Sequence, residues 1–154
     1  EVHIYHTNNN TANDDRLILS VMFDASQGWE NPFLRDLNLN NIGKPITVEL
    51  KDLFYQFKDL SYYTYKGSYT RPPCTENVRW VIMKQPLSMN EYQKNQFLDF
   101  WLYNSTVGYL GNDRNLQNIG FRSIYKVNKP GGLLDQNSLQ LALSLLTLMT
   151  LAVA

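Results

Sequence analysis

Residues 62–83 constrain the fold more than any other part of the sequence, because they combine strand-forming runs with an intervening loop. The segment opens with the aromatic run YYTY, and aromatic residues favour strands. Gly67 and Pro72-Pro73 then interrupt regular structure. Residues 78–83 (VRWVIM) are β-branched or aromatic and precede Pro86, which predicts a central strand. The segment therefore predicts a strand, a loop and a second, buried strand.

The first six residues, EVHIYH, alternate as the residues of a strand do. Glu1, His3 and Tyr5 should share one face of that strand, whereas His6 belongs to the other face. His3 and His6 therefore cannot ligate one metal ion together.

The following segments predict another strand and a few short helices. Residues 17–23 (LILSVMF) form an apolar run typical of a strand buried on both faces, and the polar residues 7–15 could join it to the first strand as a hairpin. A short helix-like run covers residues 33–37, and residues 48–57 are expected to form a short helix or a turn. Ser88-Met89-Asn90-Glu91 has the pattern of a capping box, with Ser88 accepting from the Glu91 amide. The summed pattern predicts a sheet-dominated α/β protein.

The composition gives no sign of an electrostatic partner. Lys and Arg together number 14, as do Asp and Glu, so the formal net charge is zero. No block of like charges is present, which argues against a nucleic-acid partner. The 154 residues are 44% hydrophobic, enough for one core. The sequence opens at Glu1 inside a strand-like run, without Met or a leader, so we expect that upstream residues are missing.

Three features bear on the compartment. The single cysteine, Cys74, fits a buried reduced thiol in a cytosolic protein as well as an extracellular role. The triplets that start at Asn9 and Asn104 fit the N-glycosylation pattern. Residues 139–154 contain no charged residue, which is unusual for the surface of a soluble domain.

The apolar tail, residues 139–154, is shorter than the roughly 20 residues that cross a bilayer, and no basic residue follows it. Gly131, Gly132 and the polar residues 135–138 precede it, an arrangement that resembles a GPI-attachment signal. A membrane-spanning or amphipathic helix and a helix docked on the core are the alternatives. Residues 128–138 are expected to form a linker or spacer.

Three motifs resemble those of α-class carbonic anhydrases and follow the same order. Residues 62–80 are similar to the family's active-site loop, in which a Tyr-rich strand leads through Gly-Ser-x-Thr-x-Pro-Pro to Glu-x-Val-x-Trp. Residues 1–6 resemble its Glu-x-His-x-x-His strand, and residues 112–117 resemble its Asn-x-Arg-x-x-Gln signature. The resemblance implies that residues 1–127 form the C-terminal part of the family's fold, a central mixed, mainly antiparallel sheet with short surface helices.

The resemblance also implies roles for individual residues. His3 corresponds to the third ligand of a Zn²⁺ ion, which keeps three protein ligands and one water in catalytic sites. Glu1 corresponds to the acidic residue that accepts the ligand's other ring N–H. Thr70 corresponds to the threonine that accepts a hydrogen bond from zinc-bound hydroxide. His6 corresponds to a buried histidine outside the metal site.

The expected substrate pocket differs from the family pattern at several positions. Tyr5 and Tyr69 replace smaller aliphatic side chains, and Arg71 replaces a small polar residue, so we expect a narrower pocket and slower turnover. Cys74 stands where extracellular family members place half of a disulfide, whose partner is absent here. The resemblance further implies a cis bond between Pro72 and Pro73. The implied pocket residues are Tyr5, Ile18, Tyr69, Arg71, Val78 and Trp80.

The family's other two zinc ligands come from a His-x-His pair on the strand that precedes Glu1, which this sequence lacks. We therefore expect a fragment that is inactive alone, from an extracellular, secreted or surface-anchored enzyme that converts carbon dioxide to bicarbonate and a proton. A C-terminal lipid anchor would attach such an enzyme to the membrane. The alternative is a catalytically silent, carbonic-anhydrase-related binding or adhesion domain that has lost its ligands.

Overall fold

A computed structural model describes residues 1–7, 16–26, 28–41, 47–104, 115–128 and 149–153. The chain packs into two compact units. The first contains Glu1–Met22, Lys58–Gln85 and Asp113–Ala154, and the second contains Phe23–Phe57 and Pro86–Asn112. The expected linker at residues 128–138 and most of the tail at 139–154 lie outside the described residues.

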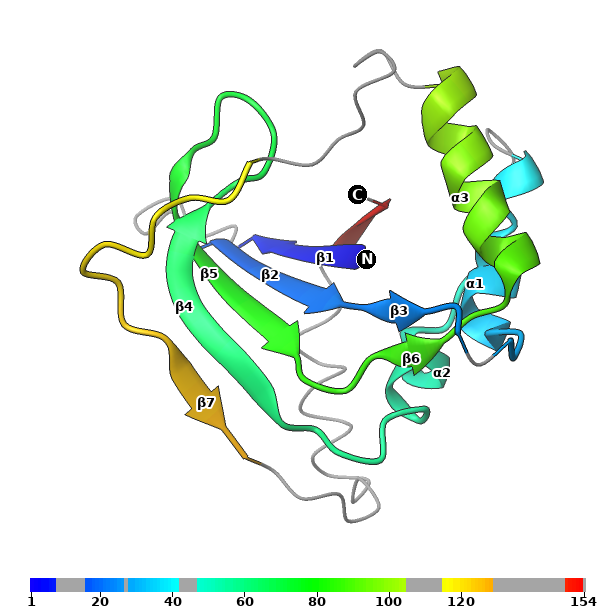
Figure 1. The fold of residues 1–154 in the computed structure, drawn as a ribbon, viewed down its shortest axis with the longest axis horizontal. Coiled ribbons are helices and arrows are strands. Elements are labelled where there is room, and N and C mark those ends of the chain that lie inside the picture. The colour runs from blue at the N-terminus through cyan, green and yellow to red at the C-terminus, as the bar shows by residue number, and fades with distance from the viewer. Residues whose placement is uncertain (8–15, 27, 42–46, 105–114, 129–148, 154) are drawn as a thin grey trace. The chain divides into compact units, whose positions relative to one another are not determined.

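The first unit is built on a mixed, mainly antiparallel sheet with the strand order β7-β4-β5-β2-β1-β8 (Figure 1). Only the β2–β5 pair is parallel, and the other four pairs are antiparallel. This confirms the predicted fold class. The strands are β1 (Val2–Thr7), β2 (Arg16–Val21), β4 (Tyr62–Ser68), β5 (Glu76–Met83), β7 (Tyr125–Val127) and β8 (Met149–Val153).

β1 and β2 pair antiparallel, as the hairpin prediction expected, with Val2 opposite Val21 and Thr7 opposite Arg16. Both faces of β1 are covered, because its neighbours Val2, His3 and Ile4 are all at most 1% exposed although they alternate in direction. A strand buried on both faces needs apolar side chains throughout, so a histidine inside it calls for a specific partner.

β5 lies between β4 and β2, which confirms the prediction of a central strand. Its burial alternates, with Val78 and Trp80 buried and Arg79 exposed. Val78 and Trp80 form one buried cluster with Tyr5 of β1 and Ile18 of β2. Full burial of such side chains contributes about 1.5–3 kcal/mol each. This cluster holds three strands together from one side of the sheet.

The described end of the tail is a strand and not a helix. β8 pairs antiparallel with β1, with Val2 opposite Val153 and His6 opposite Met149. An unpaired strand edge exposes backbone donors and acceptors, and an uncharged segment can satisfy them. The helical alternatives therefore do not hold for residues 149–153. Within the described residues, no helix is long and apolar enough to cross a membrane.

The second unit carries short helices and a small parallel sheet of two strands. The helix predicted at residues 33–37 is confirmed, and of the two alternatives for residues 48–57 the structure has a helix at Leu50–Phe54. The third helix begins later than its expected cap. The elements of the second unit are β3 (Phe23–Asp24), α1 (Pro32–Leu37), η1 (Leu39–Asn41), α2 (Leu50–Phe54), β6 (Leu87–Ser88) and α3 (Glu91–Asn104).

The capping box of α3 is formed by Asn90 and Gln93 and not by Ser88 and Glu91. Asn90 Oδ1 accepts from the Gln93 amide at 2.8 Å, and Gln93 Oε1 accepts from the Asn90 amide at 3.4 Å. Ser88 instead belongs to β6, whose pairing with β3 keeps its backbone extended. The prediction was therefore wrong by two residues, since both positions fit the capping pattern and strand pairing decided between them.

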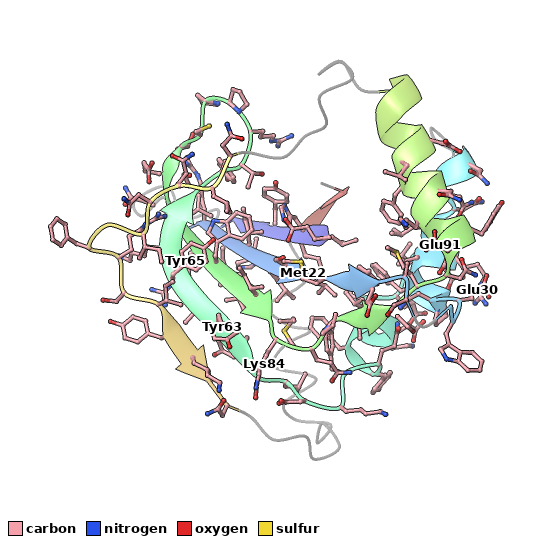
Figure 2. All side chains as sticks on the ribbon, viewed as in Figure 1. Met22, Glu30, Tyr63, Tyr65, Lys84 and Glu91 are labelled. Atoms are coloured by element: carbon pink, nitrogen blue, oxygen red, sulfur yellow. The ribbon has the colours of Figure 1, made fainter. Side chains whose placement is uncertain are left out.

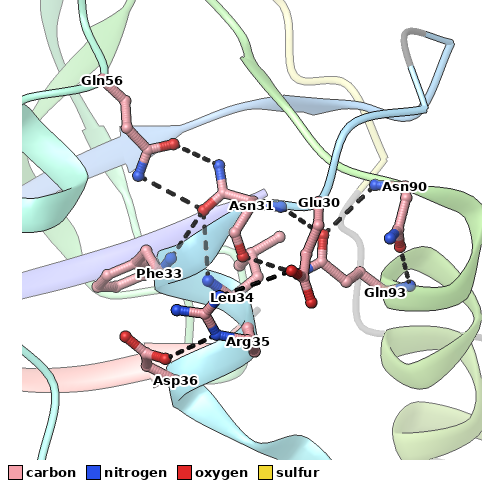
Figure 3. A network of polar contacts seen from close by, with 9 residues as sticks. All are labelled: Glu30, Asn31, Phe33, Leu34, Arg35, Asp36, Gln56, Asn90 and Gln93. Atoms are coloured by element: carbon pink, nitrogen blue, oxygen red, sulfur yellow. Dashed lines mark hydrogen bonds and ion pairs between the residues drawn. The ribbon is translucent and has the colours of Figure 1, made fainter.

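Asn31 joins three segments of the second unit through a buried polar network (Figure 3). Its Oδ1 accepts from the amides of Phe33 and Leu34, which caps α1, and its Nδ2 donates to Gln56 Oε1 at 2.6 Å and to the Ser88 carbonyl at 2.9 Å. Gln93 in turn accepts from the Asn31 amide at 2.8 Å and donates to its carbonyl at 2.7 Å. Asn31 is 1% exposed, so each of these bonds replaces water.

We predict that Asn31→Ala lowers the free energy of unfolding by about 2–4 kcal/mol, because it removes a helix cap and leaves buried partners unpaired. Urea denaturation measures the change. Asn95→Ala, at an exposed position of α3, is the control and should change it by less than about 0.5 kcal/mol. Equal effects of the two substitutions would contradict the role given to the network.

Candidate active site

The loop between β4 and β5 is fixed by its backbone and by a glycine. The β4–β5 register shifts between Gly67 and Ser68, and Trp80 Nε1 donates to the Ser68 carbonyl at 3.0 Å. A Cβ on Gly67 would lie 3.0 Å from the Tyr65 ring and 3.2 Å from the Trp80 ring, so a larger residue here would force these rings to shift. Thr70 lies two residues beyond this irregularity, just after the end of β4.

Two backbone hydrogen bonds close the loop beyond the bulge. The Tyr69 amide donates to the Thr75 carbonyl at 3.0 Å, and the Cys74 amide donates to the Arg71 carbonyl at 2.8 Å. The Pro72-Pro73 bond is cis, as the resemblance implied. Thr70 thus lies in a closed turn, and within the described residues its hydroxyl makes no hydrogen bond, so it is free to bind a ligand.

His3 and Glu1 form a pair on one face of β1, as the alternation predicted. His3 Nε2 lies 2.8 Å from Glu1 Oε1, a close polar contact whose N–H is not aligned well enough for a strict hydrogen bond. Ser20, opposite His3 in the register, donates its hydroxyl to Glu1 Oε2 at 2.9 Å. The contact with His3 is the main reason that the pKa of Glu1 is lowered, although partial burial opposes this shift.

The other ring nitrogen of His3, Nδ1, is buried and has no hydrogen-bond partner among the described residues. With Nε2 against a carboxylate, the proton belongs on Nε2 and the lone pair on Nδ1. The ring is wedged edge-on against Trp80 at a centroid distance of 5.0 Å and against Tyr5 at 6.2 Å, which fixes its direction. A rigid, neutral imidazole with a free lone pair suits Zn²⁺.

His3 therefore fits one ligand position of a zinc site. A catalytic zinc site takes three protein ligands. Within the described residues, however, no group of three or more His, Cys, Asp or Glu side chains is placed to hold a metal ion. The described part of the chain thus offers one ligand and its supporting carboxylate, and does not complete the site.

A cavity of about 420 Å³ opens beside these residues in the first unit. Glu1 and Thr70 both line it, so the structure brings together two of the three residues to which the family resemblance assigns chemical roles. Its lining residues are Glu1, Met22, Tyr65, Ser68, Tyr69, Thr70, Trp80, Ile82, Asn115, Leu116, Gln117, Ile119, Arg122 and Ile124.

The expected pocket residues divide into two groups. Tyr69 and Trp80 line the cavity, whereas Tyr5, Ile18 and Val78 lie in the buried cluster behind it. The cluster supports Trp80, on whose ring Tyr65 of β4 stacks with an interplanar angle of 8°. Figure 2 labels Tyr65 on β4. The side chains behind the cavity therefore fix the position of its wall.

Two arginines cover the aromatic residues at the loop. Arg71 lies 5.8 Å from the centre of the Tyr5 ring, and Arg16 lies 5.6 Å from that of Tyr69. The two tyrosine rings themselves are 5.8 Å apart. Such contacts between a cation and a ring favour a fixed stack. Arg71 thus packs on a tyrosine instead of lining the described cavity.

Cys74 and His6, which the sequence analysis also singled out, do not line this cavity. Cys74 is a free, partly buried thiol. His6 points to the opposite face of β1 with a buried Nδ1 that has no partner in the described residues. Asn9 lies outside the described residues, and Asn104 ends α3 while the rest of its sequon lies outside them.

Two contributors were missed. Ser20 is the single hydroxyl in the buried run LILSV, and a polar residue inside such a strand indicates a specific partner. Arg122 lines the cavity from the chain that precedes β7, and nothing in the sequence distinguishes it from a surface arginine.

Comparison with known proteins agrees with this geometry. The model of the eukaryotic-type carbonic anhydrase family matches residues 1–128. Carbonic anhydrase 4 of Mus musculus is 32% identical over 152 residues, covering 88% of this chain and 49% of that protein. The first three curated relatives are covered over only 25–49% of their length.

Solved structures give the same result. The α-carbonic anhydrase of Thermovibrio ammonificans, in complex with the inhibitor sulfanilamide, is 29% identical with a TM-score of 0.61, over 79% of this chain and 51% of that one. Dioscorin complexed with ascorbate is 27% identical with a TM-score of 0.63, over 84% of this chain and 54% of that one.

The Glu1–His3 pair predicts a pH dependence. Because the folded-state pKa of Glu1 is lowered, its contribution to stability is present above the unfolded value and is lost as the pH falls through the folded value. Urea midpoints measured from about pH 6 to about pH 3 should therefore fall less in Glu1→Gln than in the unmodified chain.

Asp24→Asn is the matched control. The pKa of Asp24 is also lowered, but by Ser26 in the second unit, so this variant should retain the contribution of Glu1. A Glu1→Gln profile identical to that of the unmodified chain would show that the pair contributes nothing.

Proposed function

Because the chain belongs to the eukaryotic-type carbonic anhydrase family, we propose that the complete protein catalyses the zinc-dependent, reversible hydration of carbon dioxide to bicarbonate and a proton. The observation that carries this proposal is the buried His3, whose Nε2 faces Glu1 and whose Nδ1 is left without a partner. A buried acceptor left without a partner costs about 1–3 kcal/mol. The Nδ1 of His6 is also unpartnered, but only His3 has a carboxylate against its other ring nitrogen.

The residues of this chain have separate tasks in such a site. When bound, zinc lowers the pKa of a water to about 7, a value taken from carbonic anhydrase itself, and so supplies the nucleophile. Glu1 fixes the tautomer and direction of His3. Thr70 would accept a hydrogen bond from the attacking oxygen and so orient it. Trp80 and Ile82 provide apolar walls for a substrate without charge.

The two other ligands must come from outside this sequence, and the sheet indicates where. Side chains on neighbouring strands lie about 4.5–5.5 Å apart, close enough to share a metal ion. β2 occupies one side of β1, so a strand that brings two histidines to His3 has to pair at the opposite side, which β8 occupies here. We therefore propose that this chain alone is inactive.

A binding domain without catalysis is the second candidate. The similarity to dioscorin supports it, because that protein carries a different name from the enzymes and was solved with ascorbate. The persistence of Glu1, His3 and Thr70 favours the enzyme. Upstream sequence discriminates between the two, since a His-x-His pair supports the enzyme and its replacement supports the binding domain.

We propose an extracellular location, secreted or anchored at the cell surface. The uncharged tail supports a GPI-attachment signal, and removal of such a signal would also free the edge of β1. Cys74 would then pair with a cysteine upstream. Asn9 and Asn104 would be glycosylation sites.

We predict that His3→Ala, in the protein with its upstream sequence, abolishes stoichiometric zinc binding. The rate of carbon dioxide hydration should fall by more than about 100-fold. A loss of roughly that size follows when a residue that only supports a metal ligand is removed, and His3 is itself the proposed ligand. Zinc analysis and stopped-flow assays measure the two effects. His6→Ala, on the same strand but the opposite face, should retain zinc and activity, and equal losses in both variants would refute the assignment of His3.

We predict that Tyr69→Leu raises kcat/KM for carbon dioxide by about three- to tenfold, because it shortens a side chain that lines the cavity. The same assay in the complete protein measures it. Tyr63→Leu, at an exposed position of β4 outside the cavity, is the control. An unchanged rate in Tyr69→Leu would show that Tyr69 does not limit turnover.

A further inference from the structure

A second cavity, of about 380 Å³, lies on the first unit where β4, β5 and the chain before β7 meet. Among the strand residues that line this cavity, Arg79 points away from the aromatic cluster, because it is flanked in β5 by the inward-facing Val78 and Trp80, and Lys66 is its register partner. Tyr65 lies on the cluster's face, so residues of both faces line the cavity. We call it the basic pocket. It is lined by Thr64, Tyr65, Lys66, Arg79, Arg122, Ser123 and Tyr125.

The basic pocket brings two cations together across a strand pair. Lys66 of β4 and Arg79 of β5 are direct partners in the antiparallel register. Like charges at such positions destabilise a sheet. No ion pair compensates either residue within the described part of the chain, and none of the described lining residues carries a carboxylate. The sheet therefore carries an unfavourable charge pair that a bound anion would relieve.

Arg122 adds a third cation in a fixed direction. Its Nε donates to the Ile119 carbonyl at 3.0 Å, and its Nη2 donates to the Asn118 carbonyl. These bonds hold the guanidinium group in place, and its remaining nitrogen, Nη1, can donate to a ligand. A group held in place before binding loses less entropy when the ligand arrives.

Hydroxyl groups complete the set of donors. Thr64 of β4 pairs with Tyr125 of β7 in the antiparallel register, and Ser123, just before β7, also lines the pocket. Arginine binds oxyanions through two parallel hydrogen bonds, lysine acts as a point charge, and hydroxyls donate to the remaining oxygens. The combined positive charge of Lys66, Arg79 and Arg122 is larger than the charge of a monovalent anion, so an anion with two or more negative charges fits the pocket better.

We propose that the basic pocket is a binding site for a small oxyanion that carries two or more negative charges, of the phosphate or sulfate class. The site is separate from the proposed hydration of carbon dioxide, because neither His3 nor Thr70 lines it. Tyr65 and Arg122 line both cavities, so the two sites share a wall.

Equilibrium dialysis of the full chain against inorganic phosphate, at constant ionic strength set with chloride, tests the proposal. We expect saturable binding of about one phosphate per chain, with sulfate competing. Arg79→Gln and Lys66→Gln should each weaken the affinity about tenfold or more, since each removes a charge-assisted contact. Lys58→Gln, at an exposed lysine outside the pocket, is the control and should leave the affinity unchanged.

A second readout separates this role from a structural one. In chloride alone, Arg79→Gln should raise the urea midpoint, because it removes the repulsion between Lys66 and Arg79. Added phosphate should raise the midpoint of the unmodified chain and of the Lys58→Gln control, but not that of Arg79→Gln. The absence of saturable binding, or equal weakening by Lys58→Gln and Arg79→Gln, would overturn the proposal. It would also fall if phosphate stabilised Arg79→Gln as much as the unmodified chain.

Discussion

The contact between Glu1 and His3 is the interaction on which the rest of the site depends. β1 is buried on both faces, and a histidine there is tolerated only with a partner for its N–H. Glu1 supplies that partner, and Ser20 on β2 steadies the carboxylate from the neighbouring strand. The hairpin of β1 and β2 thus lies inside the sheet and supports the proposed zinc ligand.

The second constraint is the bulge at the end of β4, between Gly67 and Ser68. Gly67 leaves room for two aromatic rings, and Trp80 binds the Ser68 carbonyl from the central strand. Thr70 is thereby set into a cavity that Glu1 lines as well. Packing of the aromatic residues behind the cavity and hydrogen bonding around it act on the same loop, so its chemistry and its stability rest on the same contacts.

Much of this could be predicted from the sequence, where a local pattern determined the outcome. Alternation placed Glu1 and His3 on one face, and β-branched residues marked the central strand. Non-local pairing decided the rest. The cap of α3 moved to Asn90 because Ser88 joined a strand, and residues 149–153 formed β8 because β1 offered an edge. Neither the position of the α3 cap nor the pairing of β8 with β1 can be predicted from the residues nearby in the sequence.

The tautomer of His3 tests the central claim most directly. The account requires the proton on Nε2, facing Glu1, and a free lone pair on Nδ1. Nitrogen-15 NMR of the His3 side chain distinguishes the two ring nitrogens near neutral pH, where Glu1 is ionised. The account predicts a protonated Nε2 and an unprotonated Nδ1. A proton on Nδ1 would contradict it, because that nitrogen could not then bind zinc.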